Sequence, residues 1–346
     1  MKNLVLQLGF LCLISINYGC TSQDVLAAVS LDGKWGYINT KGEEVIPLKY
    51  DYALMFTEGL AAVQLDGKYG FINTKGENVV PYQYNSIGIF SEGLALVGVD
   101  GKYGYINKKG EDVIPLKYDN NRIFSDGLAA VELDGKWGYI NTKGEEIVPF
   151  KYDEVINFVN GIAIVTLDNK RGYINTKGEE IIPLMYDDAG IFSEGYAAVK
   201  LDGKWGYINM KGEQVVPFKY DETSNFLNGL AAVNIFEKSK YWGYDDKWGY
   251  INTKGEEIIS LKYDNVSNFI EGLAVVELDD EYGYINTEGE EVIPLTFDDA
   301  TIFSEGLAAV ELGGEWGYIN KSGEMVIIPK YDFVSTFSRA KSSPKL

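Results

Sequence analysis

The chain contains no histidine among its 346 residues. This absence excludes His-dependent nucleophilic triads, histidine general acid–base catalysis and most catalytic zinc sites. The sequence also lacks a Gly-x-Ser-x-Gly elbow, a phosphate-binding Walker loop and a dinucleotide fingerprint. The enzyme class that these absences leave open is a glycoside hydrolase, because that chemistry needs only two carboxylates beside a cleft.

Basic residues are scarce relative to acidic ones. Lys and Arg number 31 against 51 Asp and Glu, so the formal net charge is −20. Phosphate contacts need clustered Lys and Arg, and this composition therefore argues against a nucleic-acid partner. Solubility explains the acidity, since self-repulsion keeps a β-rich chain from associating. Binding of cations or of a basic partner is the alternative.

Only two cysteines occur, Cys12 and Cys20. A positive residue followed by an apolar stretch over Leu4–Ile16 is typical of a secretory signal, and the stretch is too short to span a bilayer. The small residue before Cys20 resembles a bacterial lipoprotein cleavage site, so we predict a signal peptide over residues 1–19 and lipidation of Cys20. Ordinary cleavage near Ser22, giving a secreted or periplasmic protein, is the alternative. Either way the mature chain has no internal disulfide.

The sequence consists mainly of one unit of about 34 residues, repeated nine times over residues 26–338. The seventh copy is 43 residues long. A fixed period predicts a repeat architecture, in which each unit buries its apolar face against its neighbours. Residues 20–25 are then a short tether, and residues 339–346 are a divergent C-terminal tail. The copies start at Leu26, Leu60, Leu94, Leu128, Ile162, Tyr196, Leu230, Leu273 and Leu307.

Each copy contains three strand signals. In the second copy an alternating run over Leu60–Leu65 is followed by Asp66-Gly67, which predicts a two-residue type I′ hairpin. The second strand ends in an Asn-Thr-Lys-Gly turn, and the third carries a proline that marks a strand end or a sheet edge. A glycine interrupts the second strand, Gly36 in the first copy. It indicates the close approach of a neighbouring ring or backbone.

A connector with the pattern Tyr-Asp follows the third strand and leads to a phenylalanine that is present in every copy. We predict that this phenylalanine is the plug between adjacent units. The aspartate, Asp51 in the first copy, is expected to cap the connector turn by accepting backbone N–H bonds. The phenylalanines are Phe56, Phe90, Phe124, Phe158, Phe192, Phe226, Phe269, Phe303 and Phe337.

The run Gly-Lys-Trp-Gly-Tyr-Ile-Asn, followed by Val-Ile-Pro and Tyr-Asp, resembles the bacterial WG-repeat family over residues 26–337. Arg171 in place of the aromatic residue and Ser260 in place of the proline depart from the pattern. The resemblance implies an all-β repeat domain, often exported, with no established general activity and no shared catalytic residues. We therefore predict tandem small antiparallel sheets, arranged as a propeller-like ring or as an open β superhelix.

The Trp/Tyr position before the strand glycine supplies candidate binding residues. Arg171 in this series indicates that the position is at least partly open to water. In a protein-interaction scaffold these side chains should be mostly covered, whereas in a lectin-like protein they should be exposed beside polar groups. The series is Trp35, Tyr69, Tyr103, Trp137, Arg171, Trp205, Trp248, Tyr282 and Trp316.

The nine extra residues of the seventh copy replace its Asp-Gly tip by an aromatic-rich segment. Insertions in repeats map to loops, often on the binding face, so we predict a functional loop there. A duplication scar left by slippage of Trp-Gly-Tyr is the alternative. The candidate residues are Phe236, Tyr241, Trp242 and Tyr244.

Carboxylates recur at equivalent turn positions, such as Glu43, Glu77 and Glu111, which is the pattern of a scaffold rather than of one catalytic pair. The acidic runs at 279–281 and 298–299 are expected to be solvated turns, since neither forms a calcium-loop pattern. We predict a non-enzymatic, exported and monomeric scaffold without cofactor or metal. Its partner is an unknown protein or a glycan, and a lipid anchor is its only membrane attachment.

Overall fold

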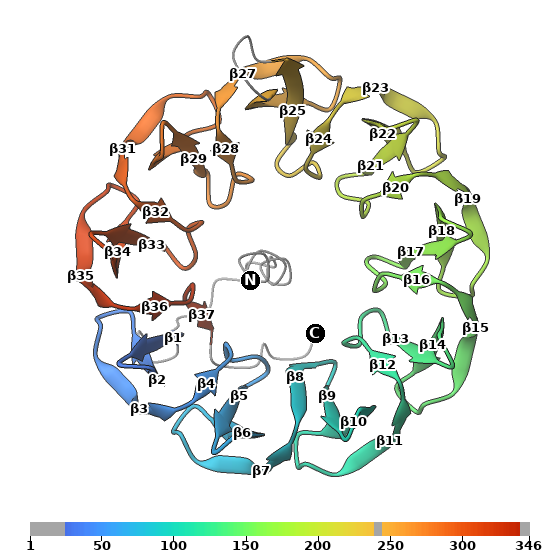
Figure 1. The fold of residues 1–346 in the computed structure, drawn as a ribbon, viewed down its shortest axis with the longest axis vertical. Coiled ribbons are helices and arrows are strands. Elements are labelled where there is room, and N and C mark those ends of the chain that lie inside the picture. Colours follow the sequence, from blue (N-terminus) through green and yellow to red (C-terminus); the bar gives the residue numbers. More distant parts are fainter. Residues whose placement is uncertain (1–24, 239–243, 340–346) are drawn as a thin grey trace.

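The computed structural model describes residues 25–238 and 244–339. The regular elements of this part are β-strands, which form nine small antiparallel sheets in a closed ring around a central opening (Figure 1). The described chain is therefore a nine-bladed β-propeller. The predicted class of small antiparallel sheets is confirmed, and the ring excludes the open superhelix. The predicted signal peptide, Cys20, Tyr241 and Trp242 lie outside the described residues.

Each sheet has a short inner strand, two central strands and an outer strand. The inner strands are β4 (Tyr52–Ala53), β8 (Ser86–Ser91), β12 (Asn120–Asn121), β16 (Glu154–Val155), β20 (Asp188–Ala189), β24 (Glu222–Thr223), β28 (Asn265–Val266), β32 (Asp299–Ala300) and β36 (Phe333–Val334). The outer strands are β3 (Glu44–Tyr50), β7 (Asn78–Tyr84), β11 (Asp112–Tyr118), β15 (Glu146–Tyr152), β19 (Glu180–Tyr186), β23 (Gln214–Tyr220), β27 (Glu257–Tyr263), β31 (Glu291–Phe297) and β35 (Met325–Tyr331).

The two central strands of each sheet form a hairpin. The first strands of these hairpins are β1 (Val25–Leu31), β5 (Leu60–Leu65), β9 (Leu94–Val99), β13 (Leu128–Leu133), β17 (Ile162–Leu167), β21 (Tyr196–Leu201), β25 (Leu230–Lys238), β29 (Ala274–Leu278) and β33 (Leu307–Leu312). The second strands are β2 (Lys34–Asn39), β6 (Lys68–Asn73), β10 (Lys102–Asn107), β14 (Lys136–Asn141), β18 (Lys170–Asn175), β22 (Lys204–Asn209), β26 (Tyr244–Asn252), β30 (Glu281–Ile285) and β34 (Glu315–Asn320).

The sheets are out of phase with the sequence copies, and this offset closes the ring. Each inner strand comes from the end of the copy that precedes the rest of its sheet. The ninth copy therefore supplies β36 to the N-terminal sheet, where Val334 pairs with Val29 of β1 (Figure 1). A further strand, β37 (Ser338–Arg339), pairs with the start of β1. Both ends of the array are thereby joined in one sheet, and β1 is not an open edge.

The turns have the backbone conformations that the sequence predicts. In the second hairpin Asp66 and Gly67 both have positive φ angles, 51° and 76°, as a type I′ turn requires. The Asn-Thr-Lys-Gly turn closes with the Gly42 N–H donating to the Asn39 carbonyl at 3.0 Å, and Gly42 has φ 77°. The proline-bearing strands are the outer edges of the sheets, as expected of strands that lack one donor.

The strand glycine is required by the backbone of the outer strand. A Cβ built on Gly36 would lie 2.6 Å from the Ile46 carbonyl oxygen and 2.8 Å from the Leu48 nitrogen. The register shifts there, because Tyr37 lies opposite Ile46 while Trp35 lies opposite Tyr50. The outer strand thus bulges over the glycine. All nine equivalent glycines meet the corresponding carbonyl oxygen at 2.4–2.7 Å, which confirms the predicted close approach of a backbone.

The core lies between adjacent sheets rather than within one, because each sheet packs on a neighbour through both faces. Tyr139 of one sheet, for example, shares a buried cluster with Phe158 and Val165 of the next. The Tyr139 and Phe158 rings lie 4.6 Å apart, and the Tyr139 hydroxyl donates to the Ile156 carbonyl at 2.6 Å. The nine repeated phenylalanines are at most 9% exposed, which confirms their role as plugs between units.

Candidate binding face

The hairpins between the two central strands share one end of the ring, because every sheet has the same topology. We call this end, which carries the tips such as Asp66-Gly67, the hairpin face. The aspartate of each Tyr-Asp pair lies just below it. Asp153 Oδ1 accepts from Lys136 Nζ at 2.6 Å, and its Oδ2 accepts from the Asp168 backbone N–H at 2.9 Å. The hydrogen bond from Lys136 lowers the pKa of the Asp153 carboxyl.

These aspartates accept backbone N–H bonds as predicted, but the predicted location of the donor is wrong. Asp153 does not cap its own connector. Its backbone partner is the hairpin tip of the following sheet, and its lysine partner belongs to the preceding one. The same arrangement spans the point of closure, where Asp32 N–H donates to Asp332 Oδ2 at 3.0 Å. The aspartates therefore link neighbouring sheets along the hairpin face.

The candidate aromatic series lies in the gaps between sheets near this face, and it is mostly covered. Trp137 is 7% exposed, and the other eight members are half-buried. Their cover comes from neighbouring sheets as well as their own: the Trp35 ring lies 5.6 Å from that of Tyr52, which is on the next sheet. This coverage is the pattern expected of a protein-interaction scaffold. In a lectin-like protein the aromatic side chains would be exposed, so that sugar rings could stack on them.

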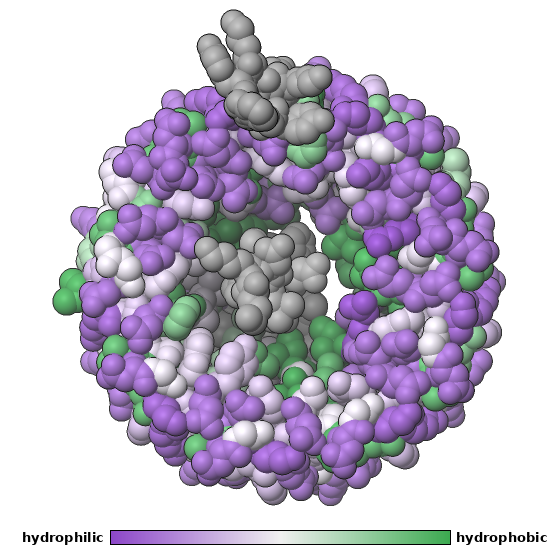
Figure 2. Space-filling view, viewed as in Figure 1, coloured by the Kyte–Doolittle hydropathy of each residue, from purple (hydrophilic) through white to green (hydrophobic). Residues whose placement is uncertain are grey.

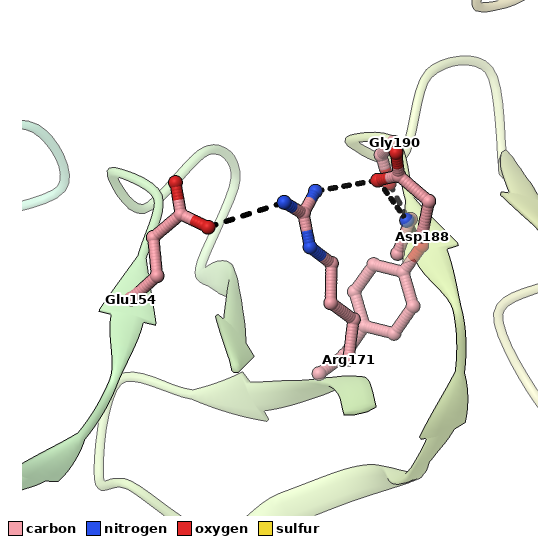
Figure 3. Close-up of polar contacts among 6 residues, drawn as sticks. Glu154, Arg171, Asp188 and Gly190 are labelled. Carbon is pink, nitrogen blue, oxygen red and sulfur yellow. Dashed lines mark hydrogen bonds and ion pairs between the residues drawn. The ribbon is translucent and has the colours of Figure 1, made fainter. Parts of the chain in front are cut away.

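Arg171 lies where the other copies have Trp or Tyr, and it bridges two sheets. Its Nη2 lies 3.1 Å from Glu154 Oε2 in its own sheet, and its Nη1 lies 2.5 Å from Asp188 Oδ1 in the next (Figure 3). The Arg171 side chain is 24% exposed. The prediction that this position is partly open to water is confirmed, and the two carboxylates compensate the guanidinium charge.

Two further positions that the sequence analysis did not single out accompany each aromatic residue. They are the first residue of the inner strand and the residue opposite it on the first central strand, such as Asp188 and Lys200 beside Trp205. Directly opposed residues share one face of a sheet, so each sheet presents a row of three side chains. These positions differ from copy to copy. An alignment of the nine copies would have revealed these two positions, because their residue types vary while the rest of the unit repeats.

One such gap is hollow. A cavity of about 380 Å³ lies between the sheets β20–β23 and β24–β27. The first sheet contributes Asp188, Lys200 and Trp205, and the second contributes Asp221, Glu222, Thr223 and Trp248. This volume lies at the lower end of the range of small-molecule sites, about 300–1,000 Å³.

The insertion of the seventh copy lengthens the hairpin beside this cavity. β25 and β26 are nine residues each, and their ladder continues to the pair Lys238 and Tyr244 (Figure 1, where the intervening residues are grey). Phe236 is 37% exposed. Its backbone N–H donates to Asp221 Oδ2 at 2.9 Å, which is the contact a regular hairpin tip makes. Of the predicted loop residues, Phe236 and Tyr244 thus lie in the strands.

The repeated carboxylates serve the turns. In each of the nine copies a glutamate accepts from the asparagine four residues before it, as Glu43 Oε2 does from Asn39 Nδ2 at 2.7 Å. Asp299 and Glu311 lie opposite each other across a strand pair, and burial with the nearby carboxylates raises the pKa of both. Within the described residues, no group of three or more Asp, Glu, Cys or His side chains has the geometry of a metal site.

A family model for the WG containing repeat matches nine consecutive segments between residues 35 and 340. The chain belongs to the WG-repeat family. Eight of the matched segments begin at the Trp/Tyr position, and the one at 172 begins just after Arg171, so the family's unit is the same one that the sequence shows. The segments are 35–69, 69–103, 103–137, 137–170, 172–205, 205–238, 248–282, 282–316 and 316–340.

Solved structures similar to this WG-repeat chain have low sequence identity to it. Dihydro-heme d1 dehydrogenase NirN in complex with DHE is 12% identical, with a TM-score of 0.51 over 93% of this chain and 76% of that one. Apo AztD from Citrobacter koseri is 13% identical, with a TM-score of 0.41 over 92% and 95%. At this identity the NirN likeness supports the fold alone. No curated protein matches the chain.

Among the described residues, no helix is long and apolar enough to cross a membrane.

Proposed function

We propose that this WG-repeat propeller is a non-enzymatic scaffold that binds a protein partner through its hairpin face at the cell surface. The observation that carries the proposal is the seventh hairpin. Its nine-residue strands extend beyond the regular tips, and Phe236, at the level where a regular hairpin turns, is 37% exposed. An apolar side chain on a protruding hairpin is typical of a contact residue, since aromatic residues are enriched in interfaces.

Three features of the ring support a scaffold. The aromatic series is mostly covered between sheets, and the repeated glutamates are engaged in turns. The hairpin tips carry exposed acidic residues such as Asp66 and Asp134. With a net charge of −20, this face favours a partner with a basic surface, since complementary charge speeds and orients association.

Shortening the seventh hairpin is expected to abolish partner binding. Replacing residues 236–246 by Asp-Gly would give this sheet the tip of the other copies, so the fold should be retained. Capture of surface proteins from the producing bacterium by the full chain and by this variant measures the effect. We expect a partner that the full chain retains and the shortened variant loses.

A matched crosslinking pair locates the contact. A photoreactive residue at Phe236 should crosslink to the partner, whereas one at Leu312 should not. Leu312 is 38% exposed and lies at the end of a regular hairpin strand, so the two sites have equal access to solvent. Equal crosslinking from both positions, or a shortened variant that keeps the partner, would favour the duplication-scar interpretation.

We further propose that the propeller is tethered to the membrane through Cys20. β1 begins at Val25, so only four residues separate Cys20 from the first strand. Stable attachment needs more than one acyl chain, because a single chain binds a membrane only marginally. Mass spectrometry of the mature N-terminus is expected to show a lipidated Cys20. The variant Cys20→Ser should leave the membrane fraction, while Cys12→Ser should remain in it. An unmodified N-terminus at Gln23 would contradict the anchor.

A further inference from the structure

The hollow between the sheets β20–β23 and β24–β27 is lined by two tryptophans. Trp205 and Trp248 occupy the same position in adjacent sheets and both line it. The residue that begins the inner strand between them is Glu222, which is exposed. Two indoles and five polar side chains are thus brought together at this junction.

The first junction of the ring shows what fits into this space. There the residues equivalent to Trp205, Glu222 and Trp248 are Trp35, Tyr52 and Tyr69. The Tyr52 ring lies between the other two, at centroid distances of 5.6 Å from Trp35 and 6.5 Å from Tyr69. A six-membered ring is therefore accommodated between the two aromatic positions at that junction, and Glu222 leaves the equivalent space open.

The aspartates that line the hollow are engaged in ion pairs. Asp188 is paired with Arg171, which also pairs with Glu154, and Asp221 lies 2.5 Å from Lys204 Nζ. Glu222 and Lys200 contribute one further charge of each sign, with the Lys200 ammonium 5.9 Å from the centre of the Trp205 ring. The hollow therefore offers hydrogen-bond acceptors as well as donors to a ligand.

A buried amide on the same face has its hydrogen bonds unmade. Asn234 is 0% exposed, and both its side-chain nitrogen and its oxygen lack a hydrogen-bond partner. It lies directly opposite Glu222 on one side and Trp248 on the other, so its side chain is on the face that the hollow adjoins. An unsatisfied buried amide destabilises a fold. Asn234 has no accessible surface and is not among the residues that line the hollow, so a ligand there would not touch it.

We propose that this hollow binds a neutral pyranose unit of a glycan. The ring lies between Trp205 and Trp248, as the Tyr52 ring does at the first junction. Its hydroxyls donate to Glu222 and accept from Lys200. The inference does not depend on the protein-binding role of the seventh hairpin.

Titration of the full chain with maltotriose, cellotriose and chitotriose tests the proposal, with tryptophan fluorescence and saturation-transfer NMR as readouts. At least one trisaccharide should bind, with transfer from indole protons to the sugar. The variant Glu222→Tyr should fill the hollow as Tyr52 does. It should weaken binding about tenfold or more without loss of thermal stability. Glu154→Tyr, the same change at the position beside Arg171, should leave the affinity unchanged.

Asn234→Leu separates the stability of this sheet from ligand binding. Removing an unsatisfied amide should raise the thermal midpoint, and it should leave the sugar affinity unchanged because Asn234 does not line the hollow. The proposal is overturned if none of the three sugars binds, or if Glu154→Tyr weakens binding as much as Glu222→Tyr. Binding of tetramethylammonium in place of the sugars would likewise overturn it, in favour of a cation cage. The variant with the shortened hairpin should still bind sugar, so the two proposals fail independently.

Discussion

Removal of residues 333–346 is expected to open the ring and to loosen the sheets on both sides of the closure. This truncation deletes β36 and β37, the strands that pair with β1, and exposes its edge. It also deletes Phe337, which is 1% exposed and packs 4.7 Å from the Tyr318 ring. Loss of one buried phenylalanine costs about 3–5 kcal/mol, so the free energy of unfolding should fall by at least that amount.

Amide hydrogen exchange measures this effect sheet by sheet. The cluster at the closure joins Val29 and Ile38 of the N-terminal sheet to Tyr318 and Ile327 of the last one. Exchange should therefore rise in β1 and β2 and also in β34 and β35. A control chain that ends at Arg339 keeps both closing strands and should exchange like the full chain. Faster exchange confined to the N-terminal sheet would contradict the closed ring.

Gly138→Ala is expected to have a large effect for a change that adds a single methyl group. The new Cβ would lie 2.6 Å from the Val148 carbonyl oxygen and 3.0 Å from the Phe150 nitrogen. Both are backbone atoms of the outer strand, which cannot give way without breaking its ladder. We expect the free energy of unfolding to fall by about 3 kcal/mol, the upper end of the usual cost of overpacking. Urea unfolding followed by tryptophan fluorescence measures it.

The matched control is Gly135→Asn at the hairpin tip of the same sheet. Gly135 has φ 76°, and a Cβ there would meet no atom within 4 Å. The chain already places Asn169 at the equivalent position of another hairpin, with φ 61°. The control should therefore change stability by less than about 0.5 kcal/mol. If the two variants lose similar amounts of unfolding free energy, the backbone conformation of the strand glycine makes it necessary. The lack of room for a Cβ atom would then not be the reason.

The features that could be predicted from the sequence are those that depend on neighbouring residues. The Asp-Gly tips need two positive φ angles, and the alternation of Leu60–Leu65 needs a strand, so both are encoded within a few residues. The repeated phenylalanine was placed between units because it recurs in every copy. Repetition also indicated the close approach at Gly36, although not that the approaching atoms belong to the outer strand's own carbonyl and amide.

The candidate site was predicted only in part. The Trp/Tyr series was identified from the sequence. It supplies one residue to each junction between sheets, and the other residues of the nine junctions differ from one another. Whether a junction is filled depends on residues from two sheets, such as Trp205 of one sheet and Glu222 of the next. The same holds for Asp153, whose lysine and backbone partners lie on either side of it in different sheets. A single copy cannot show these relations.

The sequence by itself determined that the protein is a nine-unit all-β repeat, because turn chemistry and the hydrophobic period act within one copy. The tertiary structure decided that the array is a ring. Closure depends on how nine small rotations add up, and on contacts such as that of Asp32 with Asp332 between residues 300 positions apart. It also decided that the junction between the sheets β20–β23 and β24–β27 is hollow, because that follows from the volumes of side chains that meet only after neighbouring sheets have packed.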